Sequence, residues 1–456
     1  MAKDEGIISA MTLVRKGGTL YSVLGGAQAQ VSSILGMELY DRIGIKEGTA
    51  IGTGRASEQE YKAMLQKSVR SLRINANAKS VEFGGKPYGA KAKAMLPRLA
   101  EAAEALARAL VTGAPVVVRY HNDGDGASGA VALYRAVSGL QAKIGVIESA
   151  VSWRMNKRIA YGVDELYRDR MFFDMWKSVE KPVLYVTDFG TSPESVDSLR
   201  KMKETATVIV IDHHPPYAGF PRDAASTYLN SWDLGADSDF TAGLLSSLVS
   251  ELLFKTDVED LKDASLICDY STYARDDENA RRNALVLDFM TYSRTESASP
   301  ASMNAVLTDK EKRDGTFMRA NGMQEEALAE AMKRIKSYKS SAGVNVFTLD
   351  FGHIAALDLE FPPLGRLSSI LQKRVEALNG MNAVTVVYAL ANISVRVSGK
   401  VADKVRLLDA IARLKSSVDY PVSGGGHMKA AGVSVDSSHM DEIVGRLLFE
   451  LGVAAR

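Results

Sequence analysis

The chain has 456 residues, of which 46% are apolar and 24% charged, as is usual for a globular protein. No apolar run approaches the ~20 residues that a membrane-spanning helix needs, so we expect no membrane contact. Cys268 is the only cysteine, which excludes an intrachain disulfide and a zinc site built from several thiolates. Together with an N-terminus that lacks a signal-peptide pattern, this favours a cytoplasmic protein. The length favours two or three domains.

The net charge of +1 is distributed unevenly along the chain. Residues 1–100 contain 15 Lys and Arg against 8 Asp and Glu, a net charge of +7, so the remainder carries −6. A basic segment joined to an acidic one could hold a polyanion such as a nucleic acid near bound metal ions. A solvated basic surface is the alternative interpretation.

Residues 1–95 form a basic N-terminal region whose pattern predicts no particular fold. Gly-containing stretches alternate there with short apolar runs. Residues 57–73 predict a helix with several basic side chains, and the Ala-rich residues 96–111 predict another.

From residue 114 onward, short apolar strands alternate with helices. The predicted strands are 114–120, a part of 141–151, 181–187 and 206–211, and the predicted helices are 126–137, 162–177 and 192–203. Strands that are apolar throughout and are separated by helices predict an α/β fold with a parallel sheet covered on both faces. We expect this α/β domain to span residues 96–285, with further helices at 241–254 and 260–274.

The C-terminal third of the chain predicts a largely helical connector, residues 286–340, and a second, smaller α/β domain, residues 341–456. The elements expected in the smaller domain are strands 344–349, 383–388 and 393–397, helices 364–378, 402–414 and 440–451, and a Gly-rich turn at 424–426.

Acidic residues and histidines follow three of the predicted strands. These residues are His121, Asp123 and Asp125 after strand 114–120, Asp188 after strand 181–187, and Asp212, His213 and His214 at the end of strand 206–211. Because function gathers at the carboxyl ends of parallel strands, we expect these side chains to share one pocket. Taken singly, a polar turn would explain the first motif and the two histidines, and a helix N-cap would explain Asp188.

Carboxylates mixed with imidazoles favour two Mn²⁺ ions over zinc, with Mg²⁺ or Co²⁺ as substitutes. Two such ions ~3.5–4 Å apart bind a phosphoryl group and activate a water molecule for attack on phosphorus. Asp188 could bridge the two ions, and Asp212 could fix the tautomer of a neighbouring imidazole.

Two features of the smaller domain are suited to binding an anion. Glycines in Gly424-Gly425-Gly426-His427 let backbone N–H groups approach a phosphate, and His427 could add a hydrogen bond. Arg396 offers a bidentate phosphate contact. A simple turn and a surface charge are the alternative interpretations of these two features.

Together and in this order, the motifs resemble the DHH phosphoesterase superfamily, and in particular the archaeal type of RecJ-like exonuclease. The first motif of that superfamily resembles His121–Gly126, the second contains Asp188, and the third is Asp212–His214. Asp269 matches a further acidic ligand downstream. The resemblance covers roughly residues 110–455.

The resemblance implies a DHH catalytic domain, a C-terminal substrate-binding domain and a site with two metal ions between the two lobes. The implied ligands are His121, Asp123 and Asp188 for one ion, and Asp125, Asp188, His213 and Asp269 for the other. The residues implied in catalysis are Asp125, Asp188, His213 and His214. The residues implied to grip substrate phosphates are His214, Arg396, Gly424, Gly425, Gly426 and His427.

The leading hypothesis is therefore a Mn²⁺-dependent, RecJ-like exonuclease that hydrolyses single-stranded DNA or RNA, with DNA repair as the expected setting. One alternative is a nanoRNase or phosphatase that acts on short oligonucleotides or cyclic dinucleotides. Another is a non-catalytic replication or repair subunit that binds a protein partner. Residues 1–95 do not resemble the additional oligonucleotide-binding domain of long bacterial RecJ proteins, and they are where partner binding is expected.

Overall fold

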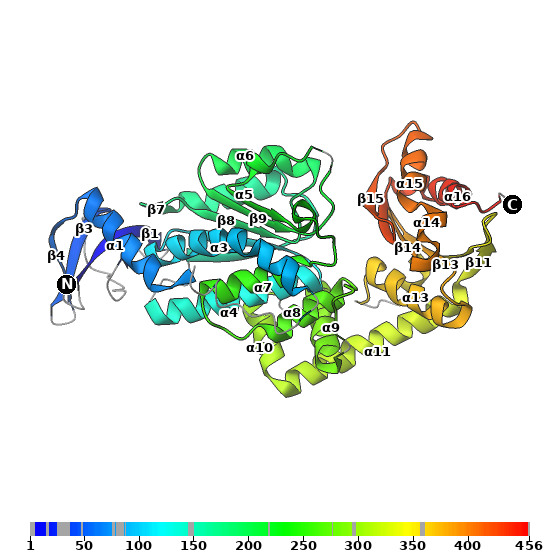
Figure 1. Ribbon diagram of the computed structural model, residues 1–456, viewed down its shortest axis with the longest axis horizontal. Coiled ribbons are helices and arrows are strands. Elements are labelled where there is room, and N and C mark those ends of the chain that lie inside the picture. Colours follow the sequence, from blue (N-terminus) through cyan, green and yellow to red (C-terminus); the bar gives the residue numbers. More distant parts are fainter. Residues whose placement is uncertain are drawn as a thin grey trace. The chain divides into compact units, whose positions relative to one another are not determined.

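The fold was analysed in a computed structural model, which describes residues 5–14, 18–24, 37–46, 49–74, 78, 86, 88–144, 150–217, 219–275, 277–293, 298–355 and 361–454. The chain divides into two compact units (Figure 1). The first contains Met1–Thr291 and Ser297–Arg313, and the second contains Tyr292–Glu296 and Asp314–Arg456. The division into four segments that the sequence suggests (1–95, 96–285, 286–340 and 341–456) stays a prediction.

An antiparallel sheet forms the N-terminal part of the first unit. Its strands are β1 (Glu5–Val14), β2 (Gly18–Leu24), β3 (Asp41–Lys46) and β4 (Thr49–Arg55), in the order β2-β1-β3-β4. Helix α1 (Glu58–Ser71) begins with a capping box between Ser57 and Glu60, and its Tyr61 packs in one apolar cluster with Ile7. Strand β7 (Trp176–Ser178) pairs with β1, so backbone hydrogen bonds join this sheet to the rest of the unit.

The second sheet of the first unit is parallel, which confirms the predicted α/β fold. Its strands are β5 (Val116–His121), β6 (Val151–Asn156), β8 (Val183–Thr187), β9 (Thr207–Asp212) and β10 (Thr227–Asn230), in the order β10-β9-β8-β5-β6. Because every strand runs in the same direction, all their carboxyl ends lie along one edge of the sheet.

For the strand expected within residues 141–151, residues 145–149 lie outside the described residues. Helix α4 continues to Ile144, and β6 begins at Val151. Strand β6 carries Arg154 and Asn156, which made it look unlike a buried strand. Both side chains have polar partners: Arg154 bonds Asp169 at 2.7 Å, and Asn156 accepts a hydrogen bond from Arg119 at 3.1 Å.

Helices cover both faces of the parallel sheet (Figure 1). One face packs against α3 (Gly89–Thr112), α4 (Gly124–Ile144) and α7 (Ala242–Leu253), and the other against α5 (Val163–Asp174) and α6 (Val196–Lys203). Along β5, Val116 and Val118 belong to the first of these cores, whereas Val117 belongs to the second. Burial on both faces explains why the strands are apolar throughout.

Among the described residues, the first unit also contains the helices α8 (Glu259–Cys268), α9 (Glu278–Tyr292) and α10 (Pro300–Thr308). No helix in the described ranges is long and apolar enough to cross a membrane.

The second unit contains a six-stranded mixed sheet, as expected for a smaller α/β domain. Its strands are β11 (Lys336–Lys339), β12 (Asn345–Asp350), β13 (Ala383–Ala389), β14 (Asn392–Val397), β15 (Ser423–His427) and β16 (Ala430–Ser434), in the order β11-β12-β13-β14-β16-β15. Its helices are α11 (Lys310–Arg334), which begins in the first unit, α12 (Gly352–Ala355), α13 (Leu364–Asn379), α14 (Ala402–Val405), α15 (Leu407–Ser416) and α16 (Met440–Glu450). The helices α15 and α16 share one apolar core with this sheet.

The Gly-rich turn expected at 424–426 was wrong, because these residues lie inside β15. The strand pairs with β16, with Gly425 opposite Gly432. The glycines allow the two backbones to approach closely: a Cβ atom on Gly426 would lie 2.3 Å from the carbonyl oxygen of Ala430. Gly426 also has a φ of +146°, which side chains rarely permit.

Candidate metal centre

The polar residues predicted from the sequence meet at the carboxyl edge of the parallel sheet. His121 is the last residue of β5, Asp188 follows β8 directly, and His213 follows β9 directly. The strands β5, β8 and β9 are neighbours in the sheet. The backbone hydrogen bonds of the sheet therefore fix the spacing of these side chains.

The first cluster consists of His121, Asp123 and Asp188. Nδ1 of His121 lies 2.6 Å from Oδ2 of Asp123 and 3.6 Å from Oδ2 of Asp188. One ligand atom from each of the three residues lies within 4.8 Å of the other two, as the binding of one cation requires.

The second cluster consists of Asp125, Asp188, His213 and Asp269. Nε2 of His213 lies 3.0 Å from Oδ2 of Asp269, 3.2 Å from Oδ1 of Asp188 and 3.7 Å from Oδ2 of Asp125. Its other ring nitrogen, Nδ1, lies 2.8 Å from the carbonyl oxygen of Ser238. This contact assigns the proton to Nδ1 of the neutral ring and leaves Nε2 able to bind a metal ion.

Asp188 belongs to both clusters and has no hydrogen-bond donor of its own. Its side chain is only 1% exposed, and the nearest donors to its oxygens are ring nitrogens of His213 at 3.2 Å and His121 at 3.6 Å, neither of which has hydrogen-bond geometry. Buried polar atoms are otherwise almost always satisfied, so two unsatisfied oxygens on one carboxylate need an explanation. A bridging position between two divalent cations supplies it, because both oxygens then have a ligand partner. The residues present therefore fit a site for two divalent metal ions.

The pKa shifts point to the same conclusion. Burial, followed by the charges of Asp188 and Asp269, raises the pKa of Asp125 well above its ordinary value. Burial and the charge of Asp123 raise the pKa of Asp188, and the two histidines offset this only in part. At this close range the negative charges of the carboxylates repel one another and raise their pKa values. Such a group of carboxylates is expected at a site where bound cations neutralise the charge.

The pKa values of the imidazoles in the two clusters are also raised, which for a histidine favours the charged form. Burial alone would lower the pKa of His213, but Asp269, Asp188 and Asp125 outweigh it and raise the pKa well above the ordinary value. Burial likewise opposes the charge of His121, whose pKa is raised by Asp123 and Asp188. In the metal-free protein, the positive charges of these imidazolium groups partly neutralise the carboxylates, as bound cations would.

Asp125 is held by the N-terminus of α7. The backbone N–H groups of Ala242 and Gly243 donate to its two oxygens at 2.9 and 3.0 Å, and the hydroxyl of Ser265 donates to Oδ1. The helix dipole favours a negative charge at this position. A Cβ atom on Gly243 would lie 2.6 Å from the carbonyl oxygen of Asp125, so this approach requires glycine.

Asp212 has a different role from the clustered carboxylates, because it belongs to neither ligand cluster and protein donors satisfy both of its oxygens. Thr191 donates its hydroxyl to Oδ2 at 2.6 Å, and the backbone N–H of His213 donates to Oδ1 at 2.8 Å. Nδ1 of His214 lies 2.8 Å from the same Oδ1. Burial is outweighed by the charge of His214 and these hydrogen bonds, which hold the pKa of Asp212 well below its usual range. Asp212 therefore orients His214, as expected for a tautomer-fixing partner.

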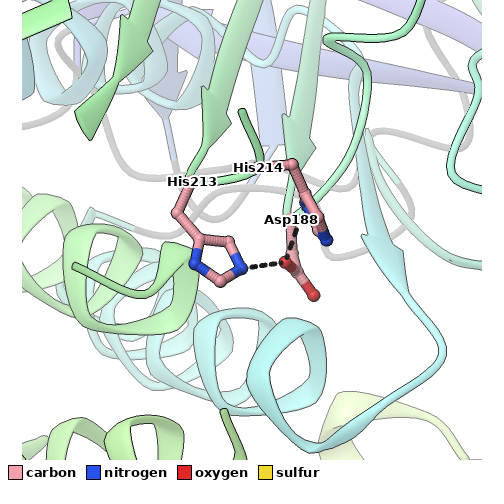
Figure 2. Close-up of side chains that lie close together, drawn as sticks. All are labelled: Asp188, His213 and His214. Atoms are coloured by element: carbon pink, nitrogen blue, oxygen red, sulfur yellow. Dashed lines mark ion pairs between the residues drawn. The ribbon is translucent and has the colours of Figure 1, made fainter. Parts of the chain in front are cut away.

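His214 lies beside Asp188 (Figure 2), and its ring is also close to that of His213, with the two ring centroids 4.7 Å apart. Its Nδ1 is 3.9 Å from Oδ1 of Asp188, and its side chain is partly exposed, unlike that of His213. An exposed imidazole whose Nδ1 is held by a buried carboxylate can present Nε2 to a ligand.

Sequence reasoning missed the residues that support the site from other helices. Asp288 of α9 accepts the backbone N–H of Gly124 at 2.6 Å and so fixes the loop between Asp123 and Asp125. Ser265 of α8 holds Asp125, as described above. No motif marks these residues, because each lies on a helix far along the chain from its partner.

A second feature that the sequence did not reveal is the loop after β6, which carries the exposed residues Lys157 and Arg158. Because β6 is parallel to β5, this loop lies at the same edge of the sheet as His121. The carbonyl oxygen of Asn156 accepts the backbone N–H of Asn122 at 3.0 Å, and its Nδ2 donates to the carbonyl oxygen of Arg158 at 2.7 Å.

The other end of this loop is tied to the segment that follows Asp188. The backbone N–H of Gly190 donates to the carbonyl oxygen of Ile159 at 3.3 Å. Lys157 and Arg158 thus lie on a loop whose two ends are hydrogen-bonded to the segments that follow β5 and β8, and neither forms an ion pair with a residue in the described ranges.

The remaining predicted residues belong to the second unit. Nε of Arg396 on β14 donates to the hydroxyl of Ser369 at 2.9 Å, and an NH2 group contacts the carbonyl oxygen of Gly365 at 3.4 Å. Gly424, Gly425 and Gly426 lie in β15, as does the backbone of His427. The side chain of His427 lies outside the part of the chain that the structure describes.

The fold and the clustered side chains define an α/β protein with a candidate divalent-cation site at the carboxyl edge of its parallel sheet. Residues 115–272 match the DHH family, N-terminal domain. An uncharacterised protein of Methanocaldococcus jannaschii, MJ1198, is 30% identical over 178 residues, which are 36% of this chain and 23% of that protein. The chain thus matches only about a quarter of the length of this relative.

Solved structures share the fold at low sequence identity. A structure described as the DHH domain of PF0399, a member of a family of ribosomal proteins, has a TM-score of 0.74 at 21% identity and covers 87% of this chain and all of that one. Exonuclease RecJ bound to manganese has a TM-score of 0.51 at 17% identity, covering 77% and 94%. Cdc45 from Entamoeba histolytica has a TM-score of 0.51 at 8% identity, covering 77% and 99%. The chain therefore shares the fold of these DHH-domain and RecJ structures.

Proposed function

We propose that this protein is a member of the DHH superfamily and a RecJ-like exonuclease that hydrolyses the terminal phosphodiester of single-stranded DNA or RNA with two Mn²⁺ ions. The observation that carries the proposal is the buried, unsatisfied carboxylate of Asp188, shared by two ligand clusters at the carboxyl edge of the sheet. The RecJ fold solved with manganese supports the choice of ion.

In this proposal, two sets of side chains hold the ions: His121, Asp123 and Asp188 one ion, and Asp125, Asp188, His213 and Asp269 the other. When bound, the ions neutralise phosphate charge and lower the pKa of the attacking water. The protein holds the ligands in position before substrate arrives, since the sheet, the N-terminus of α7 and Asp288 fix them.

His214 is proposed to contact the substrate phosphate. Asp212 holds Nδ1 of this imidazole, so Nε2 is the ring nitrogen that can donate to a phosphate oxygen. The resemblance to the superfamily also assigns phosphate contacts to Arg396 and to Gly424–His427 in the second unit. These contacts are part of the proposal.

Lys157 and Arg158 support a substrate longer than a mononucleotide. They are exposed cations on a loop that is hydrogen-bonded to the segments carrying the proposed ligands, and a phosphate neighbouring the one being cleaved is the group they suit. The basic segment 1–100 adds positive charge to the same unit.

The test is incubation of the protein with Mn²⁺ and end-labelled single-stranded DNA and RNA of graded lengths, beside the Asp125→Ala variant. Stepwise release of mononucleotides from long strands by the wild type alone is the expected result. Cleavage confined to di- to tetranucleotides or to cyclic dinucleotides would replace the exonuclease with the nanoRNase alternative. Equal activity of the variant would contradict the assigned site.

The likeness in fold to Cdc45 favours a second candidate, a replication or repair subunit without catalysis. The two candidates differ in what they require of Asp188. A non-catalytic subunit has no need of a buried carboxylate whose oxygens lack donors, so the intact ligand set favours the enzyme. Absence of hydrolysis with every substrate and metal ion would favour the subunit.

A further inference from the structure

The loop after β10 carries an exposed tryptophan, Trp232, beside the second ligand cluster. Among the described residues, four Phe, Tyr or Trp side chains are at least 40% exposed: Tyr167, Trp232, Tyr270 and Phe449. Two of these four adjoin residues of the second cluster, because Tyr270 follows Asp269 directly and Trp232 is hydrogen-bonded to His213. Exposed aromatic side chains are therefore concentrated at the candidate metal centre.

Hydrogen bonds fix Trp232 to the segment that carries the two histidines. Trp232 lies on a short 3-10 helix, η4 (Ser231–Leu234), and Nε1 of its indole donates to the carbonyl oxygen of His213 at 3.1 Å. Its backbone N–H donates to Oδ1 of Asn230 at 3.0 Å, and Nδ2 of Asn230 donates to the carbonyl oxygen of His214 at 2.9 Å. Both the indole and the backbone of Trp232 are thus tied to the residues that follow β9.

The same loop holds the imidazole of His213. The carbonyl oxygen of Ser238 lies 2.8 Å from Nδ1 of His213, and the hydroxyl of Ser238 donates to the carbonyl oxygen of His213 at 3.1 Å. The hydroxyl of Ser231 closes the loop by donating to the carbonyl oxygen of Asp237 at 2.8 Å. Trp232 and the imidazole of a proposed metal ligand therefore belong to one hydrogen-bonded unit, and the indole has a fixed place beside the cluster.

The hydrogen bond of Trp232 uses the N–H edge of the indole and leaves part of the ring uncovered. Trp232 is 41% exposed, although burial of so large an aromatic side chain is favourable. An open aromatic ring suits another planar aromatic group, and nucleobases stack on such side chains when proteins bind single strands. A strand with a phosphate at the two ligand clusters brings its bases to this part of the molecule.

We propose that Trp232 stacks against a nucleobase of the bound strand, beside the phosphate held at the two ligand clusters. This inference rests on the proposed exonuclease function and adds a residue that recognises the base. Because every base has an aromatic face, the contact accepts any sequence and either DNA or RNA. The two fused rings of a purine offer a larger stacking surface than the single ring of a pyrimidine, so purines should bind more tightly at this position.

Strand binding by variants of Trp232 tests the proposal, with fluorescence anisotropy measured in the Asp125→Ala background that prevents cleavage. Trp232→Ala should weaken the binding of a single strand roughly 5- to 100-fold, as expected for the loss of one stacked base. Trp232→Phe should bind much more tightly than Trp232→Ala, because it keeps an aromatic ring while losing the indole N–H. Phe449→Ala is the matched control, since Phe449 is an exposed aromatic residue of α16, and it should bind normally.

Strands that lack a single base test the contact itself. One abasic nucleotide is placed at successive positions from each end of the strand. With Trp232 present, one of these positions should weaken binding by about the same factor as Trp232→Ala does, because the stacked base is missing. With Trp232→Ala, the strand that is abasic at this position should bind as well as the intact strand.

Three outcomes would contradict the proposal, and they differ in what else they overturn. Normal strand binding by Trp232→Ala would refute the stacking contact and leave the proposed exonuclease intact. Equal losses in Trp232→Phe and Trp232→Ala would refute it as well, since the lost hydrogen bond to His213 would then explain the effect. A wild-type protein that neither binds nor cleaves single strands would refute the proposed function together with this inference.

Discussion

Oδ1 of Asp188 lies 3.2 Å from Nε2 of His213, and the two residues follow adjacent parallel strands. Neither position depends on a long flexible loop, because β8 and β9 end directly before them. Asp188 has a φ of +68°, an unusual value for a residue other than glycine, so the backbone turns sharply at this carboxylate. Strained backbone of this kind is concentrated at functional sites, and it aims the carboxylate at the two ligand clusters.

Asp188→Asn should separate function from stability. Loss of the bridging charge should lower Mn²⁺-dependent hydrolysis by roughly 10³-fold or more, since each ion contributes several kcal/mol. The raised pKa of Asp188 means that the folded protein disfavours its charge, so the neutral amide should raise the melting temperature of the metal-free protein. Calorimetric unfolding in EDTA, beside an activity assay, checks both effects. A lower melting temperature in EDTA would contradict the bridging account.

Affinity for Mn²⁺ should rise with pH. The pKa of His213 is raised above its ordinary value of 6.5, so the imidazole remains protonated at pH 6.5 and the ion must displace a proton. In the metal-free protein the same shift stabilises the fold below the unfolded-state pKa, and this stabilisation is lost as the pH rises through the folded-state pKa. Isothermal titration with Mn²⁺ at a series of pH values from 6.5 upward, in buffers of different ionisation enthalpy, measures both affinity and proton release. Affinity that is constant over this range, with no proton release, would count against the prediction.

Gly243→Ala should damage the metal site through steric displacement alone. The new Cβ atom would lie 2.7 Å from Oδ1 of Asp125 and 2.8 Å from the hydroxyl of Ser265, so the carboxylate must move. A disturbed support of a metal ligand typically costs about 10–100-fold in metal affinity. Gly322→Ala is the control, because Gly322 also lies in a helix but has open space around its added methyl group. We expect the control to bind Mn²⁺ normally; equal affinity of both variants would contradict the proposed role of this contact.

Replacing Lys157 and Arg158 with alanine should weaken the binding of long single strands. Each lost phosphate contact lowers the salt dependence of single-strand binding by about 0.7 in the slope of log affinity against log salt, so a change of about 1.4 is expected. Fluorescence anisotropy at graded salt, in an Asp125→Ala background that prevents cleavage, measures it. The control removes Lys67 and Arg70, two exposed basic residues of α1. An unchanged slope would show that the loop after β6 does not contact the strand.

The parallel sheet could be predicted because the apolar composition of its strands has a simple physical cause. Burial on both faces requires uninterrupted apolar runs, and such runs occur at β5, β8 and β9. The proximity of His121, Asp188 and His213 could be predicted from this sheet, since neighbouring parallel strands have their carboxyl ends at the same edge. The roles of these residues as ligands stay a prediction until an ion is observed.

Other features could not be read from sequence because their causes are distant in the chain. Strand β6 looked polar until Asp169, on α5, was seen to pair with Arg119 and Arg154. The support of Gly124 by Asp288 joins residues 164 positions apart. The glycines of β15 indicated a turn, and only the close approach of β16 explains why they form a strand.

The most direct test of the central claim is a crystal structure with Mn²⁺, with anomalous diffraction used to locate the ions. The account predicts two anomalous peaks, one bound by His121, Asp123 and Asp188, and the other by Asp125, Asp188, His213 and Asp269, with Asp188 contacting both. Two peaks that share Asp188 would support two-metal hydrolysis. No peak at this edge of the sheet, or ions bound by other residues, would contradict it.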